Sequence, residues 1–167
     1  MGRIIHLVPK SGNRSRTGPL FSFAVVSAGG KKFAIKPVHL DEVSAGHPIL
    51  AIPQGSSWLT GVINMRGRIV PVFDLHRRCG LPALADPQTG FVLTFSLDRQ
   101  YVGFIVEAVE ETLREAVGKP VPAPPGIWPG FIATVIPTSE GEFGLIEPER
   151  LLTTQEREDL ETVRAQF

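Results

Sequence analysis

Short apolar segments follow one another along most of this chain, and residues typical of turns separate them. The segments are rich in Val, Ile and Phe, and Gly-Gly, Arg-Gly or Asp-Arg pairs stand between neighbours. This pattern is typical of β-hairpins, and many short strands with little helix favour barrels or a sandwich. The sequence therefore predicts a mainly β protein. Its expected strands lie at 20–27, 33–35, 61–64, 69–73, 91–97, 101–109, 131–136 and 143–146.

Helix is expected at two places. Pro37 suits the first turn of a short helix covering Val38–Val43. The φ angle of proline is already helical, and the amide hydrogen that proline lacks would have no partner within the first turn. Thr153 and Glu156 have the spacing of a capping box, and Leu160 follows on one apolar face. The C-terminal segment should therefore form an amphipathic helix.

Two proline positions set limits on the β structure. Pro71 lies within an expected strand but has no amide donor, so it should sit at a bulge or a sheet edge. Residues Pro120–Pro129 include five prolines and should form an extended connector.

The first 19 residues differ in composition from the rest. The stretch 11–19 is polar and ends in Gly18-Pro19, so residues 1–19 are expected to form a flexible tail ahead of a folded domain at 20–167. The apolar residues near the start are too few and too interrupted for a signal peptide, and no apolar run is long enough to span a membrane. We expect a soluble cytoplasmic protein with no direct membrane insertion.

Charge and cysteine content bear on the class of partner. Lys plus Arg and Asp plus Glu number 17 each, so no overall charge draws the chain to nucleic acid. A nucleic-acid-binding barrel would need a basic, aromatic face, whereas the basic residues here are dispersed. The single cysteine, Cys79, can form no internal disulfide and fits a reducing compartment. Protein partners are therefore favoured over nucleic acid.

Catalytic chemistry is sparse. The chain has no phosphate-binding glycine loop and no nucleophile elbow, and its four histidines show no metal-ligand spacing. His76 and Cys79 are three residues apart, and a small β-barrel hydrolase using Cys79 is the alternative that this spacing leaves open. The simpler interpretation is a small apolar Cys packed under Leu81, with His76 exposed. We expect no enzymatic activity, no cofactor and no metal.

The most informative stretch is Gly61–Leu75, with the sequence Gly-Val-Ile-Asn-Met-Arg-Gly-Arg-Ile-Val-Pro-Val-Phe-Asp-Leu. Two apolar strands flank a turn in which Gly67 allows a positive φ, which would leave Arg66 projecting from the bend. A guanidinium held at a rigid turn suits protein recognition because its planar fork bonds directionally to carboxylates and carbonyls. A surface arginine that only keeps the hairpin soluble is equally consistent with the residues themselves.

The same stretch closely resembles the signature of the CheW family, Gly-x-x-Asn-x-Arg-Gly-x-x-x-Pro-(apolar)-x-Asp-Leu. The resemblance extends to Phe21–Ile35, which is similar to the opening hairpin of the family, and to His39–Val43, which is similar to its short helix. Tyr101–Val109 and Leu145–Leu152 resemble a glycine-containing strand and the closing segment. Similarity therefore covers roughly residues 20–152.

The resemblance implies two small five-stranded SH3-like β-barrels packed over a shared hydrophobic core, with short helices that include one at the C-terminus. It also implies a non-enzymatic adaptor that binds the regulatory domain of a CheA-type histidine kinase and the cytoplasmic tip of chemoreceptors. Such an adaptor acts as a monomer within a larger array and is recruited to membrane-associated receptors. The partner-binding residues that it implies are Leu40, Glu42, Asn64, Arg66 and Gly67.

The chain departs from the family pattern in its second half. The usual glycine-rich hairpin is replaced by Thr134–Gly141, and the closing strand ends in Ile146-Glu147-Pro148-Glu149. These departures leave open a divergent scaffold of the same type that serves a chemosensory pathway other than motility. Trp128, in the proline-rich connector, is expected to fill the core.

Overall fold

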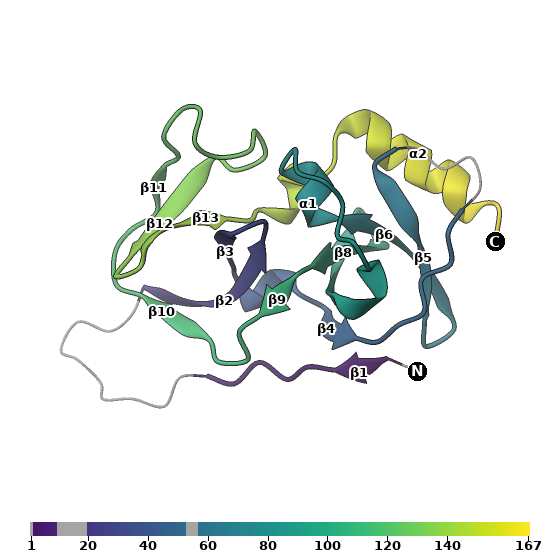
Figure 1. The fold of residues 1–167 in the computed structure, drawn as a ribbon, viewed down its shortest axis with the longest axis horizontal. Helices are drawn as coiled ribbons and strands as arrows, with labels where there is room; N and C mark the ends of the chain where they lie inside the picture. The colour runs from purple at the N-terminus through teal and green to yellow at the C-terminus, as the bar shows by residue number, and fades with distance from the viewer. Residues whose placement is uncertain (1, 10–19, 53–56) are drawn as a thin grey trace.

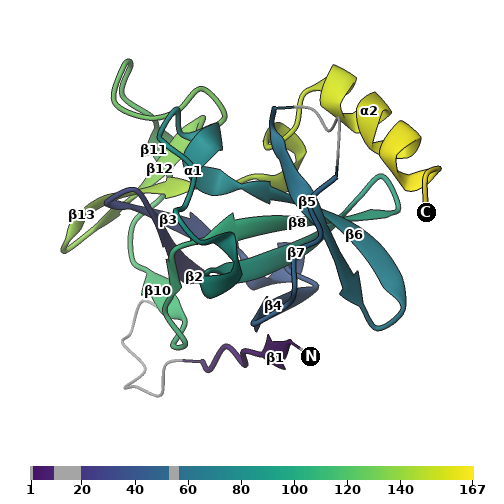
Figure 2. The same cartoon turned by 45° about the vertical axis from the view of Figure 1, so that its right-hand side comes forward.

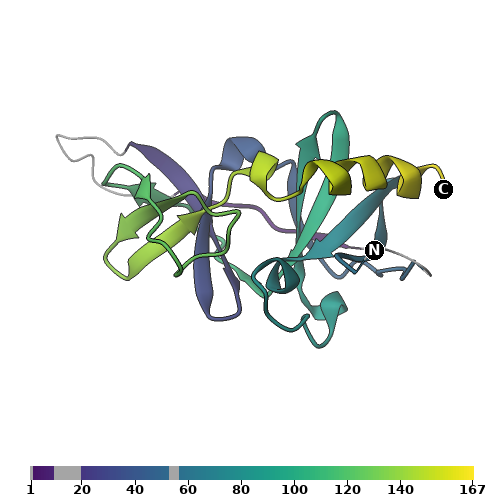
Figure 3. The same cartoon turned by 90° about the horizontal axis from the view of Figure 1, so that it is seen from above.

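The computed structural model describes residues 2–9, 20–52 and 57–167, and the fold is mainly β with few short helices (Figure 1). Two sheets account for the strands, and Figure 3 shows them as two lobes side by side. The strands are β1 Arg3–Ile4, β2 Phe21–Ala28, β3 Lys31–Ile35, β4 Glu42–Ala45, β5 Leu59–Met65, β6 Arg68–Asp74, β7 Phe91–Leu97, β8 Gln100–Val106, β9 Ala108–Val109, β10 Arg114–Ala116, β11 Val121–Pro122, β12 Thr134–Thr138 and β13 Gly141–Leu145.

The first barrel is built from the middle of the chain. Its strands pair in the order β1-β4-β7-β8-β6-β5, so β4–β8 form the predicted five strands and β1 extends the sheet at one edge. The hairpin β5–β6 pairs Asn64 with Ile69 and Met65 with Arg68, which places Arg66 and Gly67 alone in the turn. Strand β6 then runs parallel to β8 from Val72 onward.

The second barrel joins the two ends of the described domain. Its strands pair in the order β10-β2-β3-β13-β12-β11, with β9 added beside β2. The opening hairpin β2–β3 thus meets the closing strand β13, which lies parallel to β3 through the pairing of Gly144 with Phe33. From β2 onward, the chain therefore begins the second barrel, builds the first barrel, and returns to complete the second.

One hydrophobic core is shared between the barrels, as predicted. In β2, Phe23 and Val25 pack inside the second barrel, whereas Ala24 and Val26 point into the shared core. Both faces of such a strand are buried, which explains why its apolar residues run consecutively instead of alternating with polar ones. The same division holds in the first barrel. There Val70, Val72, Val92 and Ile105 fill the barrel, and Phe73, Leu93, Phe95 and Phe104 face the shared core.

The C-terminal helix is confirmed, and the other helix is wrong in extent. Helix α2, Thr154–Arg164, begins with the predicted capping box, because Thr153 accepts from the amide of Glu156 and the Glu156 carboxylate accepts from the amide of Thr153. At Val38–Val43 the structure has only a 3-10 turn, η1 Pro37–His39, followed by extended chain. Pairing of β4 with β7 outweighs the local preference for helix.

The remaining helices are short. Helix α1, Leu75–Arg78, directly follows β6, and the 3-10 turns η2 and η3 cover Pro87–Thr89 and Pro148–Arg150. None of the helices in the described ranges has the length and apolar character that crossing a membrane requires.

The expected tail is in part docked on the domain. Arg3 and Ile4 pair with Ala45 and Ser44 of β4, and Ile5 is buried in the shared core. The prediction of a flexible segment is wrong for these residues, because an alternating apolar pattern lets them add to a free sheet edge. Residues 10–19, the polar part of that prediction, lie outside the described residues.

The two proline predictions have different outcomes. The prediction for Pro71 is wrong, because β6 lies between β5 and β8 and the irregularity in the β5–β6 pairing falls between Leu59 and Gly61. The strand tolerates this proline just before Val72, the first residue that pairs with β8. The connector Pro120–Pro129 is mostly irregular and contains only the two-residue strand β11. Within it, Trp128 packs edge-on against Phe33, with the two ring centroids 5.7 Å apart.

Candidate partner-binding site

The turn between β5 and β6 is fixed by its own residues. Arg66 and Gly67 both have positive φ, 54° and 83°, which is the geometry of a two-residue hairpin turn that follows the twist of the strands. Asn64 closes the turn, since its Oδ1 accepts a hydrogen bond from the Gly67 amide at 2.8 Å. The positive φ predicted for Gly67 is confirmed, and Asn64 has a structural role in shaping the turn.

Arg66 is held by a residue of another strand, β4, which is not part of the β5–β6 hairpin. Its Nη2 donates to Oε2 of Glu42 at 2.6 Å, and Glu42 is the first residue of β4. The Arg66 side chain is 70% exposed, whereas that of Glu42 is 10% exposed. The carboxylate therefore anchors one edge of the guanidinium while the rest of the group faces solvent.

The predicted residues gather on one surface of the first barrel. Leu40, Glu42 and Arg66 line one hollow, and Asn64, Glu42 and Arg66 line a second. Gly67 follows Arg66 in the β5–β6 turn. We call the surface formed by Leu40, Glu42, Asn64, Arg66 and Gly67 the Arg66 face. In Figure 2, the β5–β6 hairpin extends to the lower right, and β4 lies nearer the middle of the molecule.

The flank of the Arg66 face carries further polar residues. The Arg68 guanidinium lies 4.8 Å from the ring centroid of Tyr101 and so stacks over it. Burial raises the pKa of the Asp41 carboxyl, and the nearby charge of Arg68 partly opposes this. Burial lowers the pKa of His47, and the charge of Glu42 partly opposes that shift. A partner that docks here meets a set of charges already arranged by the fold.

The other part of the Gly61–Leu75 stretch is buried and structural. A Cβ on Gly61 would lie 2.4 Å from the backbone oxygen of Leu50, which bridges to Val62. Asp74 is buried and caps α1, accepting from the amides of His76 at 2.8 Å and Leu84 at 2.7 Å. The signature thus combines residues that hold the fold with residues that remain exposed.

Cys79 and His76 do not form a nucleophile and base. Burial raises the pKa of the Cys79 thiol to about 11, so the thiol is protonated near neutral pH. His76 is buried, which corrects the expectation that it is exposed, because its Nε2 accepts from the Gly29 amide at 3.1 Å. That bond joins α1 of the first barrel to the β2–β3 turn of the second.

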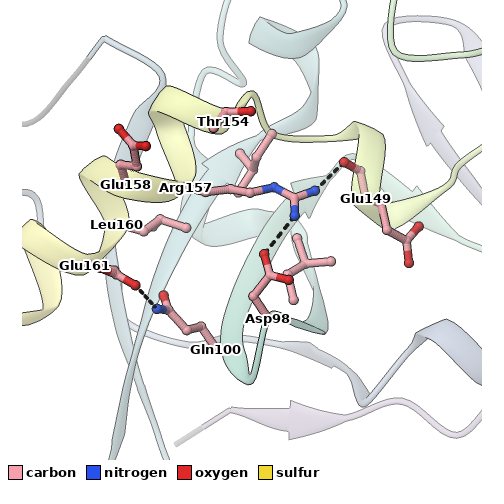
Figure 4. A pocket seen from close by; sticks show the side chains of 10 residues that line it. Asp98, Gln100, Glu149, Thr154, Arg157, Glu158, Leu160 and Glu161 are labelled. Atoms are coloured by element: carbon pink, nitrogen blue, oxygen red, sulfur yellow. Dashed lines mark hydrogen bonds and ion pairs between the residues drawn. The ribbon is translucent and has the colours of Figure 1, made fainter.

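A larger hollow lies between α2 and the β7–β8 turn (Figure 4). Arg157 crosses it, donating to Asp98 at 2.8 Å and to the carbonyl oxygen of Glu149. The Arg157 side chain is only 28% exposed. Its guanidinium is tied to both the β7–β8 turn and the segment that precedes α2, so it links these elements, in contrast to the single hydrogen bond that Arg66 makes to Glu42.

The fold consists of two SH3-like barrels that share one hydrophobic core. The β5–β6 turn of the first barrel carries Arg66, which is paired with Glu42. The family model for the CheW-like domain matches residues 22–156. The chain therefore belongs to the CheW-like family. Among the described residues, no three His, Cys, Asp or Glu side chains are placed to hold a metal ion.

Relatives of known name agree with this. A probable chemotaxis protein CheW from Rhizobium etli is 31% identical over 97 residues, which cover 56% of this chain and 62% of that protein. The chemotaxis protein CheW of Klebsiella aerogenes is 24% identical over 80% of this chain and 82% of its own. The crystal structure of the scaffolding protein TtCheW from Thermoanaerobacter tengcongensis is similar with a TM-score of 0.71 and 25% identity, covering 83% of this chain and 95% of that one.

Sequence reasoning missed several residues at the Arg66 face. Ile4, His47 and Met65 line the hollow that contains Asn64, and Ile4 also lines the hollow that contains Leu40. A signal for Ile4 was available, because Ile5 and Leu7 have the two-residue period of a strand with one buried face. The pairing of Arg66 with Glu42 leaves no such signal, since it depends on how the β5–β6 hairpin lies relative to β4.

Proposed function

We propose that this protein is a non-enzymatic adaptor that couples chemoreceptors to a CheA-type histidine kinase. Membership of the CheW-like family and likeness to a scaffolding protein support this proposal. Two linked barrels also suit the task, because each barrel presents its own outer surface while the shared core fixes their relative orientation. The half-buried thiol of Cys79, whose pKa is raised to about 11, argues against the hydrolase alternative.

The observation that carries the proposal is the exposed, anchored guanidinium of Arg66. Only its Nη2 has a hydrogen-bond partner within the described residues, which leaves donors on Nη1 and Nε directed away from Glu42. An anchored arginine loses little conformational freedom on binding and can bond two acceptors of a partner at once. We therefore assign Leu40, Glu42, Asn64, Arg66 and Gly67 to the receptor-facing surface, with Arg66 as the central contact.

The remaining parts of the proposal concern organisation. Residues 20–167 form the coupling domain together with the docked strand β1, and the protein acts as a monomer within a larger array that is recruited to receptors from the cytoplasm. The kinase contributes its regulatory domain and the receptor its cytoplasmic tip. Coupling then requires that the two partners occupy different surfaces of the same molecule.

The test is a calorimetric titration of Arg66→Glu against a soluble receptor cytoplasmic fragment and, separately, against the kinase regulatory domain. We expect at least about a tenfold loss of affinity for the receptor fragment, because the new carboxylate faces Glu42 and removes the donors. Arg99→Glu is the matched control. Arg99 is also an exposed arginine with positive φ in a two-residue turn of the same barrel, but it lines neither hollow of the Arg66 face.

Each outcome has a distinct meaning. Equal receptor affinity for Arg66→Glu and the wild type would show that Arg66 does not contact the receptor. Failure of the wild type to bind either receptor or kinase would contradict the adaptor itself. Equal losses in Arg66→Glu and Arg99→Glu would point to a general charge effect in place of a specific contact.

A further inference from the structure

The N-terminal segment crosses from one barrel to the other. At its start, Arg3 and Ile4 pair with β4, and the Ile5 amide donates to the Val43 carbonyl at 2.7 Å. At its end, the Val8 amide donates to the Glu111 carbonyl of the second barrel at 2.7 Å, and the Val8 carbonyl accepts from Leu113 at 2.8 Å. Figures 1 and 2 both show this segment running along one side of the molecule, next to β4.

The side chains of this segment alternate in direction. Ile5 is buried at 5% exposure and Leu7 packs against the same shared core. Ile4 and Val8 point outward and are 41% and 54% exposed. The inward residues account for the docking of the segment, so packing alone does not require an apolar residue at position 4 or 8.

Ile4 differs from Val8 in its surroundings. Glu42 and Arg66 line three hollows, and Ile4 lines two of these, the one that contains Leu40 and the one that contains Asn64. On one side Ile4 faces Pro37 and Leu40, and on the other it faces Pro48 and Met65. Val8 lines neither hollow. An exposed apolar side chain thus sits beside a charged group that has free donors.

We propose that Ile4 is a partner-contact residue and that the N-terminal segment forms one wall of the receptor-binding surface. This inference rests on the proposed function. The chemistry of the two hollows fits a receptor segment that places an apolar side chain against Ile4 and a carboxylate or carbonyl against Arg66. An apolar anchor next to a directional charged contact is the arrangement that concentrates binding energy at protein interfaces.

The test compares Ile4→Ser with Val8→Ser in the full chain, titrated calorimetrically against the receptor cytoplasmic fragment. Both substitutions remove an exposed apolar side chain from the same segment, so they share any effect on its docking. We expect Ile4→Ser to weaken binding about fivefold or more and Val8→Ser to leave the affinity unchanged. Thermal midpoints of the three proteins should agree within the error of the measurement.

Several results would overturn the inference. Wild-type affinity in Ile4→Ser would show that the wall makes no contact, provided that Arg66→Glu still weakens binding. Tighter binding by Ile4→Ser would mean that the segment covers the surface instead of completing it. Equal losses of affinity in both variants would show that the segment supports the fold and makes no specific contact through Ile4. If the wild-type protein itself does not bind the fragment, the proposed function fails, and this inference fails with it.

Discussion

The two ends of the β5–β6 hairpin are built from one continuous signature but meet different demands. At the buried end, Gly61 leaves room for the Leu50 backbone and Asp74 caps α1 within the protein. At the exposed end, Gly67 has no heavy atom within 4 Å of the position of an added Cβ, and Arg66 extends into solvent. The buried end is constrained by its contacts with neighbouring residues. The exposed end is constrained by the backbone conformation of its turn and by the side chain that it exposes to solvent.

This difference separates residues that fold the protein from residues that are available to a partner. A motif that is read as one unit contains both kinds, so the motif alone does not tell which residues bind. Burial and contact decide the matter residue by residue. The buried end should therefore respond to substitution through stability, and the exposed end through binding.

The largest effect should come from Phe73→Asp at the buried end. Phe73 is buried, stacks on Trp58 with ring centroids 4.5 Å apart, and stacks on Phe104 at 5.3 Å. Loss of a core aromatic costs about 3–5 kcal/mol, and burial of a charge adds to that, so the variant should be unfolded at 25 °C. Circular dichroism and thermal melting check this. Ile69→Asp, half-buried near the exposed end, is the control and should stay folded.

An unchanged thermal midpoint in Phe73→Asp would contradict the assignment of this end to the shared core. The two barrels would then be held by other contacts, and the comparison between the ends of the hairpin would lose its buried half.

A smaller effect should separate the two glycines of the hairpin. Gly61→Ala places a Cβ against the backbone of Leu50, which cannot move without breaking the bridge to Val62, and should cost about 2–3 kcal/mol. Gly67→Ala meets no neighbour and carries only the cost of positive φ, about 1 kcal/mol. Urea denaturation of both variants measures the difference. A greater loss at Gly67 would reverse the assignment of the two ends.

Local signals in the sequence predicted much of this. The β5–β6 turn, the capping box at Thr153 and Glu156, and the hairpin around Asp98 could be derived from short-range chemistry alone. Wherever a distant partner decides the structure, local reasoning failed. Val38–Val43 is not a helix because β4 pairs with β7, and His76 is buried because Gly29, 47 residues away, donates to it.

The candidate site shows the same limit. Asn64, Arg66 and Gly67 could be placed together because they are neighbours in the chain, and family resemblance added Leu40 and Glu42. The direct bond between Glu42 and Arg66 depends on how the β5–β6 hairpin lies relative to β4, and the position of Ile4 depends on a segment docking at the free edge of β4. Contacts that arise from tertiary packing leave no periodic pattern in the sequence to read.

The smallest effect on stability, with a clear effect on binding, should come from Arg66→Gly. Arg66 has φ of 54°, a conformation that glycine adopts without strain and that costs other residues about 1 kcal/mol. The ion pair joins an exposed guanidinium to a Glu42 side chain that is only 10% exposed, so leaving that carboxylate without its partner should cost about 1–2 kcal/mol. The relief of positive φ offsets most of this cost, and the free energy of unfolding should fall by at most about 1 kcal/mol. The affinity for the receptor fragment should nevertheless fall, because the guanidinium is gone. An arginine kept at a position where glycine would fold as well is explained by what it binds. A loss of stability above about 2 kcal/mol in Arg66→Gly would show instead that the ion pair supports the fold, and both ends of the hairpin would then be structural.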